Sequence, residues 1–295
     1  MPMNTKNKLI FCGNSSIDHI ITTTGTKNII GGSAVNSAIA AANQTDKNIA
    51  IISSVGSDFP VNILDDINID TKYLCRLTTK SNSFVINEVN NNVTLVGNTY
   101  LPINLPDDVI TDYLHVSCRK GVPFIDAINK IKARHYSLDV MWSSVKDFLP
   151  ELTDYFKKAD FLFCNDSEFK IMQRYGLMDI VPKNLALFIT DCNGVTYQKD
   201  SERKYFSTIK ANKIVSTVGA GDTFLGSFLS SFDGNNLNEA VYRALSMASL
   251  SIRDFGNIHL INKTEEINKV TKIIRNMDKC NTTEFNIHNR PVLQR

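Results

Sequence analysis

An aspartate directly follows a Gly-Ala-Gly turn, at Gly219-Ala220-Gly221-Asp222. A β-branched run precedes the turn and apolar residues follow it at helical spacing, so the sequence predicts a buried strand at 214–218, a tight turn and a helix start. Free N–H groups at a helix start favour an anion. A carboxylate beside a phosphate suits a base that takes the proton of a hydroxyl attacking a phosphoryl group. Alternatively, Asp222 only stabilises the helix dipole.

A second group of polar residues lies near the N-terminus, after an apolar run at 8–12 that predicts a central strand. Asp18 lies on the next predicted strand, and its carboxylate would be a strong acceptor for sugar hydroxyls. Gly31-Gly32 precedes an Ala-rich helix, and Asn36 in its first turn offers both a donor and an acceptor. The alternatives are a solvent-facing aspartate on an edge strand and a tightly packed core helix.

A third segment, Asn165 to Glu168, directly follows a predicted strand at 161–164 and opens a helix. Asn-x-x-Glu at a helix start is close to a capping box. The same carboxylate could order a magnesium ion through water, because Mg²⁺ keeps several waters and needs few protein ligands. Both interpretations stay open on the residues alone.

In chain order, these segments resemble the ribokinase-like (PfkB) family of carbohydrate and nucleoside kinases. The run 216–224 is similar to the C-terminal signature of that family, the run 31–42 to its N-terminal signature, and 165–168 to its Asn-x-x-Glu motif. A Gly-x-x-x-x-Asp segment of the family matches Gly13 and Asp18. The resemblance covers roughly residues 8–258, which is most of the chain.

The resemblance implies ATP and Mg²⁺ as co-substrate and cofactor, and it implies roles for individual residues. Asp222 would be the catalytic base, and the amides of Gly219, Ala220 and Gly221 would form the anion hole. The residues implied to bind the acceptor are Asp18, Gly31, Gly32 and Asn36. The residues implied to bind the nucleotide are Asn165, Glu168, Thr190, Gly194, Thr217, Gly219 and Gly221, with Glu168 reaching Mg²⁺ through water.

Two departures from the family pattern matter. The family usually begins its C-terminal motif with Asp, which belongs to the cation site of potassium-activated members, and this chain has Ser216. A requirement for a monovalent cation is therefore in doubt. The family's Thr-x-Gly-x-x-Gly loop is one residue shorter here and lacks its first glycine, at 190–194, so the nucleotide contacts of this loop are uncertain.

Strands alternate with helices of about ten residues from Tyr113 onward, including helices expected at 123–133 and 144–157. This alternation predicts an α/β fold, a doubly wound and mostly parallel sheet with helices on both faces, as in ribokinase-like proteins. Two β-rich runs at 81–89 and 93–101 flank Asn90-Asn91-Asn92 and predict a hairpin. With residues 15–24, they would form a small β-sheet lid.

The predicted domain organisation is a kinase domain at 1–262, followed by a C-terminal segment at 263–295. That segment would hold one amphipathic helix, at 264–277, and a polar tail from residue 279 whose apolar content is low.

Composition narrows the function classes. The chain has 295 residues, 43% of them hydrophobic, and a net charge of +2, which is ordinary for a soluble protein and gives no nucleic-acid footprint. No apolar run approaches a membrane span, and the N-terminus lacks a signal-peptide core. The six cysteines form no C-x-x-C pair, which is typical of reduced thiols. We expect a cytoplasmic location, a sugar or nucleoside as partner, neither nucleic acid nor membrane, and a possible homodimer through the lid.

The predicted function is transfer of the γ-phosphoryl group of ATP to a hydroxyl of a sugar or sugar-like molecule. One alternative within the family is a nucleoside kinase, whose lid aromatics Phe84 or Tyr100 would stack on the base. Another is a catalytically weak protein that binds a sugar or nucleotide and acts through partners. Retention of Asp222 with the full glycine turn weighs against the last alternative, since a binding protein needs no base.

Overall fold

The computed structural model describes residues 8–45, 47–89, 92–97, 100–141 and 149–288. Within these residues, ten strands form one large sheet in the order β14-β13-β12-β11-β10-β9-β1-β4-β5, with β6 also paired to β4. The strands from β12 to β5 are parallel, and only β13 and β14 run antiparallel at one edge. Their bounds are β1 (Lys8–Cys12), β4 (Asn48–Val55), β5 (Ile69–Asp70), β6 (Leu74–Arg76), β9 (Ile110–Cys118), β10 (Lys132–Val140), β11 (Phe161–Asn165), β12 (Ala186–Asp191), β13 (Gly194–Lys199) and β14 (Glu202–Ser207). The predicted mostly parallel sheet is confirmed.

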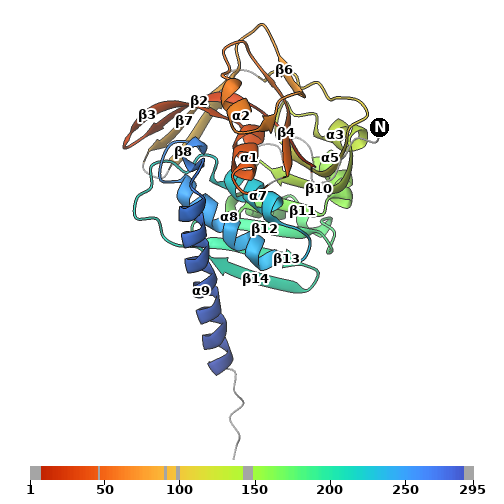
Figure 1. Ribbon diagram of the computed structural model, residues 1–295. Coiled ribbons are helices and arrows are strands. Elements are labelled where there is room, and N and C mark those ends of the chain that lie inside the picture. The colour runs from red at the N-terminus through yellow and green to blue at the C-terminus, as the bar shows by residue number, and fades with distance from the viewer. Residues whose placement is uncertain (1–7, 46, 90–91, 98–99, 142–148, 289–295) are drawn as a thin grey trace, which may run out of the picture.

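Helices cover both faces of this sheet (Figure 1). Successive side chains of a strand point to opposite faces, and β1 shows it: Leu9 and Phe11 join one buried cluster, while Ile10 and Cys12 join the other. The first cluster is closed by α1 (Ser33–Ala42), α2 (Asn62–Asp66), α7 (Ala220–Ser231), α8 (Leu237–Ser251) and α9 (Thr264–His288). The second is closed by α3 (Phe124–Lys130), α5 (Leu149–Lys158) and α6 (Asp166–Arg174).

A second, four-stranded sheet forms the lid. Its order is β3-β2-β7-β8, with bounds β2 (Ser16–Thr22), β3 (Gly25–Gly31), β7 (Asn82–Val89) and β8 (Asn92–Gly97). The buried side chains Ile20, Phe84 and Ile86 pack against Val218 and Phe255 from the main body. The strands of the predicted hairpin are confirmed, although β8 ends at Gly97, and the turn residues 90–91 lie outside the described residues. Strand β3 was not predicted.

The predicted strand at 214–218 is wrong. This segment is irregular, and Ile214 is 56% exposed. Val215 N–H donates to the carbonyl oxygen of Ile252, at the end of α8, over 2.8 Å. β-branched residues favour strands only where a neighbouring strand can pair with them, and here the neighbour is a helix end.

Two predicted helices have different bounds in the structure. The helix expected at 123–133 ends at Lys130, because β10 begins at Lys132. The first residues of the helix expected at 144–157 lie outside the described residues, and its described part is α5.

The C-terminal helix α9 continues to His288, so the predicted end at Met277 is wrong. Its first turns place Ile267, Val270 and Ile274 in the main core, against α8, and the remaining turns extend away from the body (Figure 1).

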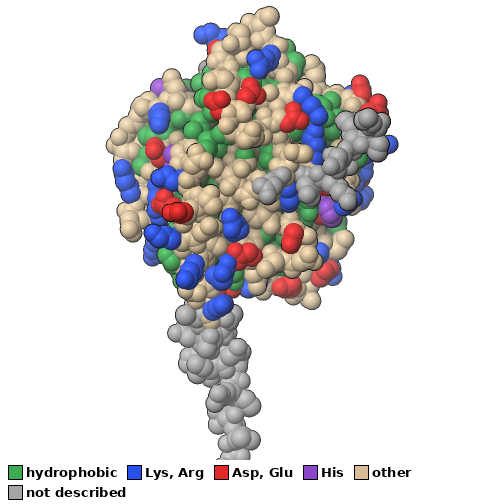
Figure 2. All heavy atoms as spheres, viewed as in Figure 1, with side chains coloured by type: hydrophobic (Ala, Val, Ile, Leu, Met, Phe, Trp, Pro, Cys, Tyr) green, Lys and Arg blue, Asp and Glu red, His purple; other side chains and the backbone are tan. Residues whose placement is uncertain are grey.

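Basic and acidic side chains are interspersed on the molecular face that Figure 2 shows, as the near-neutral net charge of +2 leads one to expect. Among the described residues, no helix has the length and apolar character needed to cross a membrane.

Candidate active site

The glycine turn and helix α7 form the centre of the site. Gly219 has φ of 78°, a left-handed conformation that favours glycine, and it turns the chain into α7. Phe224 and Phe228 anchor the helix, since both rings pack against Phe188 of β12, at centroid distances of 6.1 and 4.5 Å. Thr223 N–H donates to Gly219 O over 2.8 Å and closes the first turn. The first residues of α7 are therefore held close to the carboxyl ends of the sheet strands, where α/β proteins bind ligands.

The carboxylate of Asp222 is buried at 8% exposure, and both its oxygens are engaged. Oδ1 accepts a hydrogen bond from Arg119 Nη2 over 2.9 Å, and Oδ2 accepts one from Asn36 Nδ2 over 3.2 Å. Burial raises the pKa of Asp222 above its ordinary value, although Arg119 opposes this shift. The side chain is therefore a stronger base than an exposed aspartate.

Arg119 comes directly after β9 and joins Asp222 to a second carboxylate. Its Nη2 and Nε donate to Oδ2 of Asp139, in β10, over 2.7 and 3.3 Å. His115 Nε2 lies 3.3 Å from the other oxygen of Asp139. Burial alone would raise the pKa of Asp139, but Arg119 and His115 hold it well below its usual range. Asp139 is thus a permanent anion that fixes Arg119.

Asp18, on lid strand β2, lies close enough to Asp222 for the charge of Asp222 to act on its pKa. It is 4% exposed, its Oδ1 has no hydrogen-bond partner among the described residues, and its other oxygen packs against Gly31. Burial raises the pKa of Asp18 to about 6, and the like charge of Asp222 adds to the shift. The hydroxyl of Ser16 opposes this rise in pKa, but a buried carboxylate oxygen without a hydrogen-bond partner is still costly, so Oδ1 is suited to accept a hydrogen bond from a ligand.

Further buried polar oxygens without partners among the described residues surround Gly13, at the end of β1. They are Asn14 Oδ1, Ser33 Oγ and Ser117 Oγ. A Cβ on Gly13 would come within 3.1 Å of Ser117 Oγ and would overlap Ser33 Oγ, so both hydroxyls lie against this glycine. Buried polar groups are normally paired, and such a cluster is suited to a ligand with several hydroxyl groups.

Asn165 and Glu168 form the capping box of α6. Asn165 Oδ1 accepts the Glu168 N–H over 2.9 Å, and Glu168 Oε2 accepts the Asn165 N–H over 2.8 Å. The capping interpretation is therefore confirmed. Burial raises the pKa of Glu168 to about 7, and the charges of Asp139 and Asp222 contribute to the shift. Because the cap uses only Oε2, the second carboxylate oxygen is left for water or a cation.

One cavity of about 180 Å³ lies between the start of α7 and the start of α6. It brings together six predicted site residues, namely Asn165, Glu168, Thr190, Gly219, Gly221 and Asp222, with Arg119 and Asp139 in its wall. Asn36 is joined to it by its hydrogen bond to Asp222, and Asp18 is near enough for the charge of Asp222 to raise its pKa. Gly32 precedes α1 as its N-cap.

Three predicted site residues make other contacts in the structure. The N–H of Ala220 donates to Thr217 O over 3.2 Å, so this amide is already used. Gly194 lies in the hairpin of β12 and β13, where its N–H donates to Asp191 Oδ1 over 2.9 Å. Asp191 thus points into the turn, and it does not line the 180 Å³ cavity.

Thr217 contacts the lid. Its N–H and Oγ1 donate to Glu88 Oε1, on β7, over 2.8 and 2.5 Å, and Ser216 Oγ donates to Glu88 Oε2. The residue that replaces the family's Asp therefore pairs with a carboxylate supplied by the lid. This contact ties the lid to the segment just before the glycine turn.

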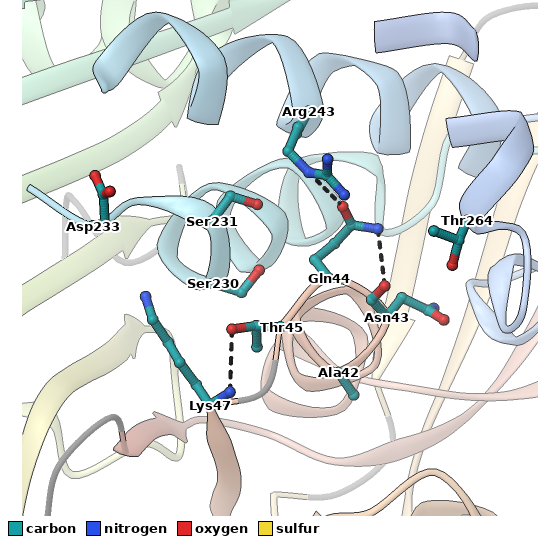
Figure 3. A pocket seen from close by; sticks show the side chains of 10 residues that line it. All are labelled: Ala42, Asn43, Gln44, Thr45, Lys47, Ser230, Ser231, Asp233, Arg243 and Thr264. Carbon is teal, nitrogen blue, oxygen red and sulfur yellow. Dashed lines mark hydrogen bonds between the residues drawn. The ribbon is translucent and has the colours of Figure 1, made fainter. Parts of the chain in front are cut away.

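A larger cavity, of about 630 Å³, lies at the opposite end of the strands (Figure 3). Its cations are committed to protein groups: Lys47 Nζ donates to Leu229 O and Phe232 O at the end of α7, and Arg243 Nε donates to Gln44 Oε1. Since α/β sheets bind ligands beyond the carboxyl ends of their strands, and Lys47 precedes β4, we do not assign the active site here.

Sequence reasoning did not assign roles to Arg119, Asn14, Ser33 or Ser117. A usable signal was present for Arg119, because it directly follows a predicted strand of the parallel sheet, where side chains meet at one edge. Asp139, near the end of β10, lies at the same edge and lines the cavity with Asn165 and Gly219.

Comparison with known proteins decides the family. The model of the pfkB family carbohydrate kinases matches residues 116–264, which is half of the chain. The chain belongs to the pfkB family of carbohydrate kinases. It is accordingly a kinase, with the fold of the ribokinase-like proteins.

Individual relatives include both sugar and nucleoside kinases. The chain is 23% identical to a ribokinase of Staphylococcus aureus, over 90% of this chain and 99% of that protein. It is 25% identical to a nucleoside kinase of Methanocaldococcus jannaschii, over 68% of this chain and 72% of that protein.

Solved structures establish the fold. A ribokinase from Cryptococcus neoformans in complex with ADP superimposes with a TM-score of 0.74 at 17% identity, covering 90% of this chain and 99% of that one. The Methanocaldococcus jannaschii nucleoside kinase gives a TM-score of 0.73 at 21% identity with the same coverage.

Proposed function

We propose that this kinase transfers the γ-phosphoryl group of ATP to a hydroxyl of a sugar or sugar-like molecule, with Asp222 as the base. The observation that carries the proposal is the position of Asp222. Its carboxylate lies at the start of α7, is buried, has a raised pKa and accepts a hydrogen bond from Asn36. It lies near Asp18, whose Oδ1 has no partner among the described residues. A base, an anion-binding helix start and a hydroxyl-binding carboxylate thus meet at one point.

The acceptor would bind through Asp18, Asn36 and the backbone around Gly31 and Gly32. The unpartnered Oδ1 of Asp18 would accept a hydroxyl, which removes the cost of leaving it buried and unpaired. Asn36 would hold the reacting hydroxyl within reach of Asp222. This arrangement positions one hydroxyl oxygen in line with the phosphorus atom, the main requirement of phosphoryl transfer.

The start of α7 would stabilise charge on the transferring phosphoryl group. No hydrogen bond from the amides of Gly219 or Gly221 is found among the described residues, and both glycines line the cavity. The Ala220 amide would contribute only after giving up its bond to Thr217 O. Preorganised amides of this kind stabilise developing charge without reorganisation.

ATP would extend from this point along the ends of β11 and β12. Asn165, Glu168 and Thr190 line that side of the cavity, and Gly194 and Thr217 would contact the nucleotide only at its margin. A single carboxylate with a remaining oxygen fits Mg²⁺, which takes most of its ligands from phosphates and water. When bound, Mg²⁺ would neutralise charge on the β- and γ-phosphates. With Ser216 paired to Glu88, we propose no dedicated site for a monovalent cation.

The charges at the site favour a neutral acceptor over a sugar phosphate. Among the described residues, the charged side chains that meet here include four carboxylates, Asp18, Asp139, Glu168 and Asp222, and one guanidinium, which is already paired with two of them. A second phosphate on the acceptor would be repelled.

A nucleoside is the second candidate acceptor. Tyr100 is 40% exposed and packs edge-on against Phe84 of the lid, at a centroid distance of 6.0 Å, so its ring could stack on a base. Phe84 itself is buried in the lid core and is less available.

The lid also offers a surface for a second copy of the chain. Strands β3 and β8 each have one edge that is not paired within the described residues, and most of β3 is exposed. We propose a homodimer through this sheet, by edge pairing, and sedimentation of the purified chain would test it.

The decisive experiment measures ADP release with Mg²⁺ and ATP for D-ribose, fructose 6-phosphate and inosine, beside Asp222→Asn. We expect ribose or inosine to stimulate turnover, fructose 6-phosphate to be inactive, and the variant to lose at least about 10²-fold in kcat, as removal of a catalytic base does. No stimulation by any acceptor, with ligand binding unchanged in the variant, would instead support a protein that binds without catalysis.

A further inference from the structure

The guanidinium group of Arg119 lies where the base and the helix start meet. Its Nη2 is shared between Asp222 Oδ1, at 2.9 Å, and Asp139 Oδ2, at 2.7 Å. Arg119 lines the same 180 Å³ cavity as Gly219 and Gly221, and its side chain is 25% exposed. A fixed positive charge therefore lies within hydrogen-bond reach of the proposed base and beside the proposed anion hole.

The two carboxylates hold Arg119 unequally. Asp139 accepts from two of its nitrogens, Nη2 and Nε, and its second oxygen faces His115. Asp222 accepts from Nη2 alone, and its second oxygen is occupied by Asn36. Asp222 is thus the partner that can release Arg119 while Asp139 still holds it.

Arg119 also keeps unused donor capacity. A guanidinium carries five N–H groups in a planar fork that suits phosphate oxygens. The three hydrogen bonds above use Nε and Nη2, and Nη1 donates no hydrogen bond to the described residues. A guanidinium group that has free N–H donors and is open to a small cavity beside the proposed anion hole can bind the oxygens of a phosphoryl group.

We propose that Arg119 is a catalytic residue that binds the phosphoryl group during its transfer, and that it exchanges Asp222 for the phosphoryl oxygens while Asp139 anchors it. This inference rests on the proposed function. Asp222 lies in the first turn of α7. A γ-phosphoryl group bound at the start of this helix would therefore be adjacent to Asp222, and its oxygens would compete with that carboxylate for the N–H groups of Arg119 Nη2.

The exchange prepares the base for its step. The acceptor hydroxyl oxygen forms a bond to the γ-phosphorus, the bond from that phosphorus to the bridging oxygen breaks, and ADP leaves with the electron pair. The hydroxyl proton passes to Oδ1 of Asp222, the oxygen that Arg119 has released. Loss of the neighbouring positive charge makes Asp222 more basic, and the same charge then balances the three phosphoryl oxygens.

The test compares Arg119→Gln and Arg119→Lys with wild type, and uses Arg134→Gln as the matched control. Arg134 is also an arginine, but its side chain is 74% exposed and its Nη1 lies 3.6 Å from Asp112 Oδ1. We expect Arg119→Gln to lower kcat by about 10²- to 10³-fold, the range for loss of one oxyanion donor. Arg119→Lys should fall between this variant and wild type, and Arg134→Gln should stay within threefold of wild type.

Ligand binding separates a transition-state contact from a structural role. Affinities are measured for two complexes. The first contains Mg·ADP alone. The second contains Mg·ADP, aluminium fluoride and the acceptor selected above, and the aluminium fluoride stands in for the transferring phosphoryl group. In Arg119→Gln, the aluminium fluoride complex should weaken about 100-fold or more, and Mg·ADP alone less than threefold, because only transition-state interactions distinguish the two. Thermal unfolding of each variant tests whether it is folded. If Arg119→Gln does not fold, kcat and the aluminium fluoride affinity of Arg119→Lys, which keeps the charge, test the inference instead.

Three results would overturn the inference: kcat of Arg119→Gln within threefold of wild type, equal weakening of both complexes, or an equally large loss in Arg134→Gln. If Arg119→Gln does not fold, Arg119→Lys with wild-type kcat and wild-type aluminium fluoride affinity would overturn it as well. The proposed function fails separately, and takes the inference with it, if wild type shows no acceptor-dependent turnover.

Discussion

Replacing Asp18 by Asn should make the protein more stable and less active. Asp18 is 4% exposed, its Oδ1 has no partner among the described residues, and burial raises its pKa to about 6, from about 3.9 for an exposed aspartate. The shift of about 2 pKa units corresponds to roughly 3 kcal/mol, at 1.36 kcal/mol per unit, by which the charged form destabilises the folded state. Asn removes the charge and nearly preserves the shape, so the free energy of unfolding at pH 7.5 should rise by about 1–3 kcal/mol.

The sign of the pH dependence follows from the direction of the shift. Above pH 6, Asp18 is ionised in both the folded and the unfolded state, and the folded state carries the full cost. As the pH falls from 6 toward 4, the folded state takes up the proton first, and the cost disappears. The advantage of Asp18→Asn should therefore be largest near pH 7.5, fall to about half by pH 5, and fall to about a fifth by pH 4.

Urea unfolding of the ligand-free chain at pH 7.5, 6.0 and 5.0 measures this effect. The matched control is Asp58→Asn: the Asp58 carboxylate accepts the Ser81 N–H over 2.8 Å, and this hydrogen bond lowers its pKa. That variant should lose stability or stay unchanged at pH 7.5. In the same preparations, Asp18→Asn should raise the KM of the acceptor by about 10- to 100-fold, since a hydrogen bond to a charged group contributes about 1.5–3 kcal/mol.

The reasoning would be refuted if Asp18→Asn were less stable than wild type at pH 7.5, or if its advantage were the same at pH 5.0. An unchanged acceptor KM would leave the stability argument intact but remove Asp18 from the acceptor site.

Two further predictions concern contacts that join distant segments. Glu88→Gln weakens the hydrogen bonds between the lid and Thr217. It should raise the acceptor KM about tenfold and increase ATP hydrolysis without acceptor, because an opened lid admits water. If both values are unchanged in steady-state kinetics, these hydrogen bonds do not control lid closure. In Gly226→Ala, the new Cβ in α7 would overlap the Ser37 carbonyl oxygen of α1. The free energy of unfolding measured in urea should therefore fall by about 2–4 kcal/mol, although alanine favours helices. A stabilised variant would mean that α1 and α7 can separate without cost.

Local patterns in the sequence were sufficient to predict the turn at Gly219, the start of helix α7 and the class of fold. Gly219 turns the chain into α7 as expected, because the left-handed conformation there depends on glycine itself. The alternation of strands and helices likewise predicted the covered parallel sheet, since each element carries its own periodicity. The capping box at Asn165 is a contact between residues three apart, so the sequence already contained it.

Only the tertiary structure brought Arg119 and Asp139 to Asp222. Arg119 is 103 residues from Asp222 in the chain and 20 from Asp139, and their meeting depends on β9 and β10 being neighbours in the sheet, which no local pattern specifies. The same holds for Glu88, which reaches Thr217 from 129 residues away. The strand wrongly expected at 214–218 failed for the same reason: a β-branched run becomes a strand only when a partner strand is present, and pairing is decided by contacts between distant parts of the chain.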